Sequence, residues 1–227
     1  MSRSRIAQAI LLSIAALGST RAESLDAVLA SMDHASKDFK SMSAKIKQTD
    51  YTAVISETNN RSGEMRLKRS KGGLTALVDF KEPEPRMIHL SGNKAEVYYP
   101  KAKTVEIYDA AKYAGAIDQL LLLGFGTSVS ELNQAYAITL GGAETIDGIK
   151  TSRLELTPKT ADLQKNVTAI ELWIPDGKGN PVQEKILKTS KDYTLIVYSD
   201  LQLNPSLPDS AFALNRPKDV KEIHPQK

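Results

Sequence analysis

The sequence predicts an α+β fold in which a curved antiparallel sheet of about eleven strands carries short helices on one face. Two observations lead to this prediction. Most of the 227 residues fall into short runs that alternate between apolar and polar side chains, and turn residues separate these runs. Residue patterns that are typical of a helix are found only near residue 25 and in the middle of the chain. Short connections between strands favour antiparallel neighbours, so the strands should form a meander.

Residues 1–22 have the parts of a secretory signal peptide: a basic start (1–5), an apolar stretch (6–18) and small residues ending in Ala22. The apolar stretch is shorter than the ~20 residues that span a bilayer. We therefore expect cleavage after Ala22 rather than a single membrane anchor. No later stretch could span a bilayer, so residues 23–227 should form one soluble domain outside the cytoplasm.

The charge of the mature chain is balanced. Arg3, Arg5 and Arg21 lie in the leader, which has no acidic residue, and the rest of the chain has 27 basic and 27 acidic residues. This balance argues against a protein that binds nucleic acid or anionic membranes through a basic surface. The absence of cysteine excludes disulfides, a thiol nucleophile, thiolate metal sites and a lipid-modified N-terminal cysteine.

The mature chain should open with a helix. Apolar residues recur there at steps of three and four, which gives one apolar stripe. The stripe consists of Leu25, Val28, Leu29, Met32, Ala35 and Phe39.

Strands follow on both sides of the middle segment. The predicted strands are residues 43–57, 62–69, 74–80, 86–90, 94–99, 104–108, 136–140, 150–157, 167–174, 181–187 and 194–203. Turn signals divide them, among them Asn59-Asn60, Glu82-Pro83, Gly141-Gly142 and Asp147-Gly148. The alternation predicts one apolar face and one polar face for the sheet.

Residues 114–125, AGAIDQLLLLGF, form the most apolar run after the leader. A helix that is apolar most of the way round has to be buried, and the flanking glycines give its backbone freedom to move. We interpret this run as a short helix that lies over the sheet as a lid. Ser128 and Glu131 then match a capping box, which should start a second short helix that ends near Gln134.

A sheet of this width must curl, and three short helices would cover its apolar face incompletely. The gap would suit acyl chains, because each buried methylene contributes about 0.8 kcal/mol. A dry, filled core would have the same periodicity, and periodicity alone favours the filled core.

Catalysis is not expected. The chain has no nucleophile elbow, no zinc-protease motif and no phosphate-binding glycine loop. Its three histidines, His34, His89 and His224, are dispersed among ordinary segments. We expect no catalytic residue, no metal site and no cofactor.

The run GEMRLKR occupies residues 63–69, and SGNK at 91–94 is followed by VYYP at 97–100. The first run resembles a strand motif of the LolA family of outer-membrane lipoprotein carriers, and the second pair is similar to that family's next hairpin. LTPK at 156–159 and IELWI at 170–174 resemble further signatures. Together the matches cover nearly the whole mature chain in order.

The resemblance implies a half-open antiparallel β-barrel with a helical lid over its apolar concave face. It implies a monomeric periplasmic carrier that receives triacylated lipoproteins from an inner-membrane lipoprotein-releasing ABC transporter and passes them to an outer-membrane acceptor lipoprotein. The apolar cavity and lid would then include Met65, Leu67, Leu74, Ala76, Val78, Phe80, Leu120, Leu121, Leu123, Ile170 and Leu172.

Arg69 matches a family arginine that holds the lid through hydrogen bonds, a role that suits a guanidinium with five donors. The alternative for Arg69 is a solvated strand end. Ser70 departs from the proline common at this point in the family, and Ala76 and Val78 stand where bulkier rings are usual. A carrier of another amphiphile, such as a glycolipid or other membrane lipid, or an envelope lipoprotein sensor on the same fold would need the same apolar cavity.

Overall fold

The computed structural model describes residues 23–70, 73–111 and 121–225. Its elements in chain order are α1 (Leu25–Lys37), β1 (Ser41–Thr52), β2 (Glu57–Ser70), β3 (Gly73–Glu82), β4 (Arg86–Ser91), β5 (Lys94–Tyr99), β6 (Thr104–Asp109), α3 (Val129–Ala135), β7 (Tyr136–Ile146), β8 (Ile149–Pro158), α4 (Ala161–Gln164), β9 (Val167–Pro175), β10 (Gln183–Lys188), β11 (Tyr193–Leu203), η2 (Asp209–Phe212) and β12 (Lys221–Ile223). The predicted signal peptide and residues 114–120 of the predicted lid lie outside the described residues.

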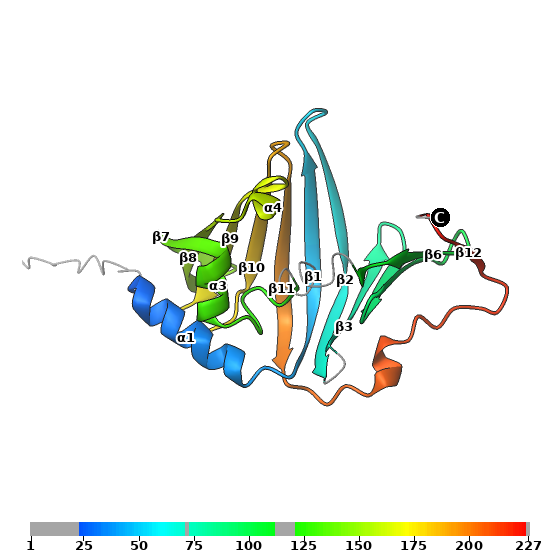
Figure 1. Cartoon of the computed structure of the whole chain (residues 1–227), viewed down its shortest axis with the longest axis horizontal. Helices are drawn as coiled ribbons and strands as arrows, with labels where there is room; N and C mark the ends of the chain where they lie inside the picture. Colours follow the sequence, from blue (N-terminus) through cyan, green and yellow to red (C-terminus); the bar gives the residue numbers. More distant parts are fainter. Residues whose placement is uncertain (1–22, 71–72, 112–120, 226–227) are drawn as a thin grey trace, which may run out of the picture.

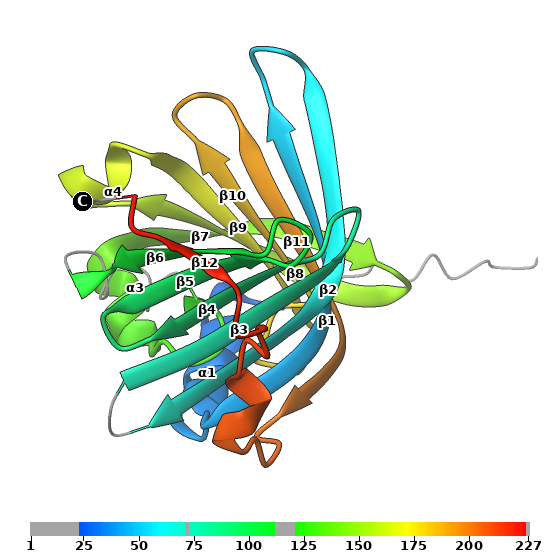
Figure 2. The ribbon, with the colours of Figure 1, turned by 90° about the vertical axis from the view of Figure 1, so that its right-hand side faces the viewer.

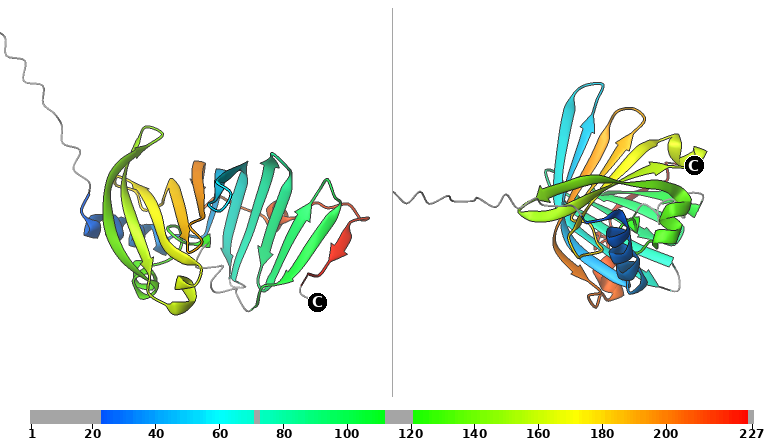
Figure 3. Two further views of the ribbon diagram at one scale, coloured as in Figure 1. Left: turned by 90° about the horizontal axis from the view of Figure 1, so that it is seen from above. Right: turned by 90° about the vertical axis from the view of Figure 1, so that its left-hand side faces the viewer.

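The strands form one sheet of twelve, in the order β12-β6-β5-β4-β3-β2-β1-β11-β10-β9-β8-β7. All neighbours are antiparallel except β12, which pairs in parallel with β6. Figure 3 shows that the sheet curves strongly and that its two edges, β7 and β12, stay apart. The predicted α+β fold with an open half-barrel is therefore confirmed. The strand missing from the prediction is β12, whose three residues are too few to show an alternating pattern.

Two helices lie on the concave side of the sheet, in front of β7 to β10 (Figure 1). The helix α1 buries Val28 and Met32 against this half of the sheet. Phe39, predicted as part of its stripe, lies beyond the end of the helix and packs against the other half. The predicted capping box of α3 is confirmed: Ser128 Oγ accepts from the Glu131 amide at 3.2 Å, and the Glu131 carboxylate accepts from the Ser128 amide at 2.8 Å.

The hairpin between β1 and β2 is longer than predicted. The predicted turn at Asn59-Asn60 is wrong, because the chain reverses at residues 53–56 and Thr52 pairs with Glu57. Asn60 instead continues the ladder, with its side-chain oxygen accepting a 2.8 Å hydrogen bond from Thr49. The hairpin consequently projects beyond its neighbours (Figure 1). Gly141-Gly142, also predicted as a turn, forms a bulge inside β7.

The convex side of the sheet has an apolar patch as well. Leu77, Tyr98 and Val105 point away from the concave face and pack against Phe212 and Leu214 of the C-terminal segment. Figure 2 shows this segment running over β3 to β6. The prediction of one apolar and one polar face is therefore wrong for this half of the sheet. No helix among the described residues is long and apolar enough to cross a membrane.

Candidate functional site

The concave face carries the apolar rows predicted from strand alternation. In the β2–β3 ladder Met65 lies opposite Val78, and Leu67 lies opposite Ala76. Because paired residues of antiparallel strands point to the same side of a sheet, these four side chains share one face. They form a single cluster with Leu74 and with residues of β1.

We call residues 121–127 the covering segment, because they close over this face. The amides of Phe125, Gly126 and Thr127 all donate to the carbonyl oxygen of Leu122, at 2.9, 2.9 and 3.2 Å. This tight turn directs the side chains of Leu122 and Phe125 into the cluster formed by β1 to β3, where both are buried. Leu123 points into a second cluster. One short segment therefore covers both halves of the concave face.

The second cluster is built on β8 and β9. Ile170 and Leu172 alternate along β9 and are almost completely covered, as are their partners Leu156 and Leu154 on β8. Side chains from α1 and α3 close the cluster from the other side. The two helices and the covering segment together bury this half of the sheet.

Most predicted cavity residues thus lie on the concave face. Those in the first cluster are Met65, Leu67, Leu74, Ala76 and Phe80, with Val78 and Leu121 partly buried beside them. Leu123, Ile170 and Leu172 lie in the second cluster. Leu120 lies outside the described residues. Leu122 and Phe125, absent from the predicted site, are more fully buried than Leu121, and the leucine run with the phenylalanine that follows it was the signal for them.

Arg69 joins the end of β2 to the covering segment. Its Nη2 donates to the carbonyl oxygen of Gly126 at 2.7 Å, and its guanidinium carbon lies 5.9 Å from the centre of the Phe39 ring. A Cβ on Gly126 would lie 2.8 Å from the Phe39 ring and 2.9 Å from Arg69 Nη2, so only glycine allows this close approach. Hydrogen bonds from Ser128 lower the pKa of Glu131, and the positive charge of Arg69 lowers it further.

A second hydrogen bond holds the covering segment from the opposite half of the sheet. Asn180 Nδ2 donates to the carbonyl oxygen of Gly124 at 3.1 Å, in a buried position. Gly124 has a φ of +73°, a conformation that favours glycine, and Pro181 fills the space where a Cβ would lie. Sequence reasoning missed Asn180, because an asparagine before a proline reads as an ordinary turn.

A buried carboxyl group lies between the two clusters. Glu184 pairs across the sheet with Leu172 on one side and Ile196 on the other. Burial raises the pKa of Glu184 to about 8, although the hydrogen bond from the Tyr198 hydroxyl, 3.2 Å away, acts to lower it. Tyr198 also contacts the covering segment, because its ring meets that of Phe125 edge-on at 5.2 Å between centroids.

Sequence reasoning missed Glu184 as well. A signal was present, since Glu184 occupies the middle position of an otherwise apolar alternation with Val182 and Ile186. A carboxyl group at such a position is either exposed at an edge or buried and uncharged.

The space under the covering segment is small. A cavity of about 140 Å³ is lined by Arg69, Leu122, Leu123, Thr127, Glu131, Leu132, Ala135 and Tyr136. Ligand pockets usually measure ~300–1,000 Å³. In this closed arrangement the space directly under the covering segment is too small for a bulky apolar ligand, so binding there requires the covering segment to move.

The described residues contain no group of three or more His, Asp or Glu side chains placed to hold a metal ion. His34 and His224 are exposed. His89 lies on the convex face, where its Nδ1 is 3.2 Å from the Glu96 carboxylate.

The chain is similar to several solved structures of low sequence identity. No curated protein sequence matches the chain. Among solved structures, an uncharacterized conserved protein from Thermus thermophilus shares 11% identity with a TM-score of 0.54, covering 88% of this chain and 98% of that one. MucB shares 13% identity with a TM-score of 0.51, covering 84% of this chain and 63% of MucB. Mycobacterium tuberculosis lipoprotein LppX shares 17% identity with a TM-score of 0.49, covering 82% of this chain and 100% of LppX.

These similarities to solved structures concern the fold. The family model described as outer membrane lipoprotein carrier protein LolA matches residues 37–215, from the end of α1 to beyond η2. The match includes the covering segment, Arg69 with its partner Gly126, and all of the strands except β12. The chain therefore belongs to the LolA family.

Proposed function

We propose that this chain is a periplasmic carrier that binds the acyl chains of lipoproteins on its concave face and carries them from the inner to the outer membrane. The observation that carries the proposal is the apolar concave face with its covering segment, held by side-chain hydrogen bonds from Arg69 and Asn180. In this proposal residues 1–22 are a signal peptide that is removed, and residues 23–227 are one LolA-like carrier domain without enzymatic activity.

The cost of opening the covering segment offsets part of the free energy that is gained when acyl chains are bound. Lifting the covering segment exposes Leu122, Leu123 and Phe125, at a cost of about 1.5–3 kcal/mol each. Losing the two hydrogen bonds adds about 1 kcal/mol or more each. An acyl chain regains about 0.8 kcal/mol per buried methylene, so about ten methylenes offset the opening. The ligand is then bound, and closure of the empty carrier favours its release.

The proposed partners follow from this role. Triacylated lipoproteins are the cargo, an inner-membrane lipoprotein-releasing ABC transporter is the donor, and an outer-membrane acceptor lipoprotein is the recipient. In the described part of the chain most arginines and many lysines are paired with acidic side chains, and we propose no nucleic-acid partner.

The test is a release assay. Purified mature protein is incubated with inner-membrane spheroplasts that hold a radiolabelled triacylated lipoprotein, and the supernatant is fractionated by size. The proposal predicts labelled lipoprotein in a one-to-one complex with the carrier, and none without the carrier. Failure of release would contradict the lipoprotein role. If the protein nevertheless extracts other lipids from the membranes, its cargo is a different amphiphile.

A further inference from the structure

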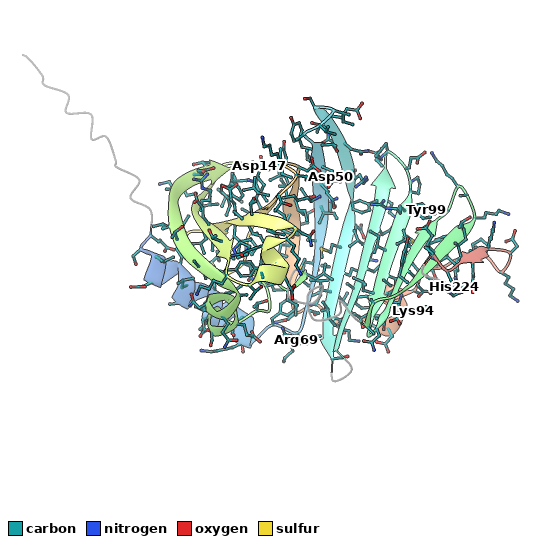
Figure 4. The ribbon with its side chains drawn as sticks, turned by 45° about the horizontal axis from the view of Figure 1, so that its top comes forward. Asp50, Arg69, Lys94, Tyr99, Asp147 and His224 are labelled. Atoms are coloured by element: carbon teal, nitrogen blue, oxygen red, sulfur yellow. The ribbon has the colours of Figure 1, made fainter. Side chains whose placement is uncertain are left out.

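The end of the concave face that lies away from Arg69 is polar. Figure 4 places Asp50 and Tyr99 toward the end of the sheet with the projecting hairpin, and Arg69 at the other end. Between these ends the apolar row finishes at Phe80. The guanidinium carbons of Arg61 and Arg86 lie 5.9 and 5.3 Å from the centre of the Phe80 ring. Two cations therefore flank the last aromatic side chain of the apolar surface.

The two arginines differ in their partners. Arg61 Nη1 lies 2.6 Å from Asp50 Oδ2, and Asp50 also accepts hydrogen bonds from Gln48 and Thr194. Arg61 is therefore neutralised by a well-held carboxylate. Arg86 forms no ion pair within the described part of the chain, and its Nε is buried without a hydrogen-bond partner there.

Two further acids near Arg86, Glu106 and Glu84, have other hydrogen-bond partners. The Glu106 carboxylate accepts from the hydroxyls of Tyr99 and Tyr108, at 3.3 and 2.8 Å. The Oε1 atom of Glu84 lies 3.4 Å from the Nζ atom of Lys101. Because Arg86 is partly buried and its Nε has no hydrogen-bond partner among the described residues, Arg86 is suited to receive an external anion.

A pocket opens beside Arg86. It has a volume of about 160 Å³ and is lined by Asn59, Arg61, Pro83, Glu84, Pro85, Arg86 and Tyr99. This volume is large enough for a phosphate group, since about 10–15 Å³ of such space already holds one water molecule. Arg61 and Arg86 offer planar guanidinium donors of the kind that bind phosphate oxygens.

We propose that Arg86, assisted by Arg61 and Tyr99, binds the phosphate group of a membrane phospholipid whose acyl chains lie along the same concave face. This inference rests on the proposed function, since it takes acyl-chain binding as given, and it adds phospholipids to the ligands of the protein. The distance along β2 from Arg61 to Arg69 is about 26 Å at ~3.3 Å per residue. The head group and the covering segment therefore lie at opposite ends of the acyl-binding surface.

The test compares ligands that differ only in the phosphate. Isothermal titration calorimetry measures binding of dihexanoyl phosphatidic acid, dihexanoylglycerol and inorganic phosphate to the mature protein and to Arg86→Gln, Arg86→Lys and Arg66→Gln. Arg66 is the matched control, because it lies on the same strand as Arg61 and points to the convex face, where Glu64 pairs with it. Melting temperatures establish that each variant is folded.

Wild type and Arg66→Gln should bind phosphatidic acid tenfold or more tighter than dihexanoylglycerol, as expected for a hydrogen bond to a charged group. Arg86→Gln should lose this preference and keep its affinity for dihexanoylglycerol, while Arg86→Lys should keep part of it. If Arg86→Gln does not fold, the test depends on Arg86→Lys. The ratio of the affinities for phosphatidic acid and dihexanoylglycerol should then be smaller for Arg86→Lys than for wild type.

Three outcomes count against the inference. Equal affinities of wild type for the two lipids would overturn it and leave the proposed function intact. Inorganic phosphate binding as tightly as phosphatidic acid, and lost in Arg86→Gln, would assign the pocket to free phosphate instead. Failure of wild type to bind either lipid would overturn acyl-chain binding, and with it the proposed function.

Discussion

The guanidinium of Arg69 donates a 2.7 Å hydrogen bond to the carbonyl oxygen of Gly126. Arg69 comes near the end of β2, and Gly126 lies in the covering segment 57 residues further along the chain. The bond therefore connects the sheet directly to the segment that closes its concave face. Its loss should change the balance between closed and open protein more than the stability of the sheet.

Arg69→Leu should raise the affinity for acyl ligands and slow their release. Removal of a hydrogen bond from a charged donor costs the closed state about 1.5–3 kcal/mol. A larger open population then lowers the apparent dissociation constant, by about tenfold to a hundredfold where the closed state dominates. The measurement is the dissociation rate of a fluorescent fatty acid from wild type and variant.

Arg66→Leu is the matched control for this substitution. Arg66 lies on the same strand but contacts Glu64 and the Ala211 carbonyl on the convex face. Its loss should leave the dissociation rate unchanged. Equal rates for Arg69→Leu and wild type would remove Arg69 from the control of closure.

Gly126→Ala should loosen the covering segment. The added Cβ would lie 2.8 Å from the Phe39 ring and 2.9 Å from Arg69 Nη2, so one of these groups must move. We expect faster hydrogen exchange at the amides of Phe125, Gly126 and Thr127, which all donate to the Leu122 carbonyl.

Gly141→Ala provides a comparison, since its Cβ would meet only the flexible ends of Glu155 and Arg153. This variant should leave exchange in the covering segment unchanged. Similar exchange in Gly126→Ala and wild type would show that the close approach at Gly126 does not hold the segment.

The sheet and the face that carries the site were predictable because both depend on local alternation. Met65 and Leu67, two residues apart on a strand, had to point to the same side, and the structure places them together. The turn at residues 53–56 was not predictable, because Val54 and Ile55 continue an apolar strand pattern in sequence. Asn180 and Glu184 act through side-chain contacts with other segments, at Gly124 and Tyr198, and periodicity contains no information on such contacts.

Leu121→Asp should abolish loading of acyl ligands while leaving secretion largely intact. Leu121 is partly buried against the first apolar cluster, so a charge there opposes docking of the covering segment and repels an apolar ligand. The release assay with labelled lipoprotein measures the effect. Val54→Asp is the control, because Val54 is 89% exposed at the tip of the β1–β2 hairpin. Unchanged loading by Leu121→Asp would count against a role for residue 121 in covering the cavity.

The pH dependence of stability should report the buried carboxyl group of Glu184. Its pKa is about 8 in the folded protein, raised by burial from an ordinary value of 4.5. Between these two pH values the folded state keeps a proton that the unfolded state releases. The free energy of unfolding should therefore fall as pH rises from about 5 to 8, by up to about 1.4 kcal/mol per pH unit from this group, and level off above pH 8.

Glu184→Gln isolates this contribution, because glutamine has nearly the same shape and does not ionise. Urea unfolding of both proteins at several pH values from 5.5 to 9 gives the difference in stability. Tyr198 and Tyr136, the phenols affected by Glu184, have pKa values raised from 10.0 by burial, so neither titrates in this window. The stability of wild type relative to the variant should decline steadily toward pH 8 and then stay constant. A difference that does not change with pH would mean that Glu184 is ionised in the folded protein at neutral pH.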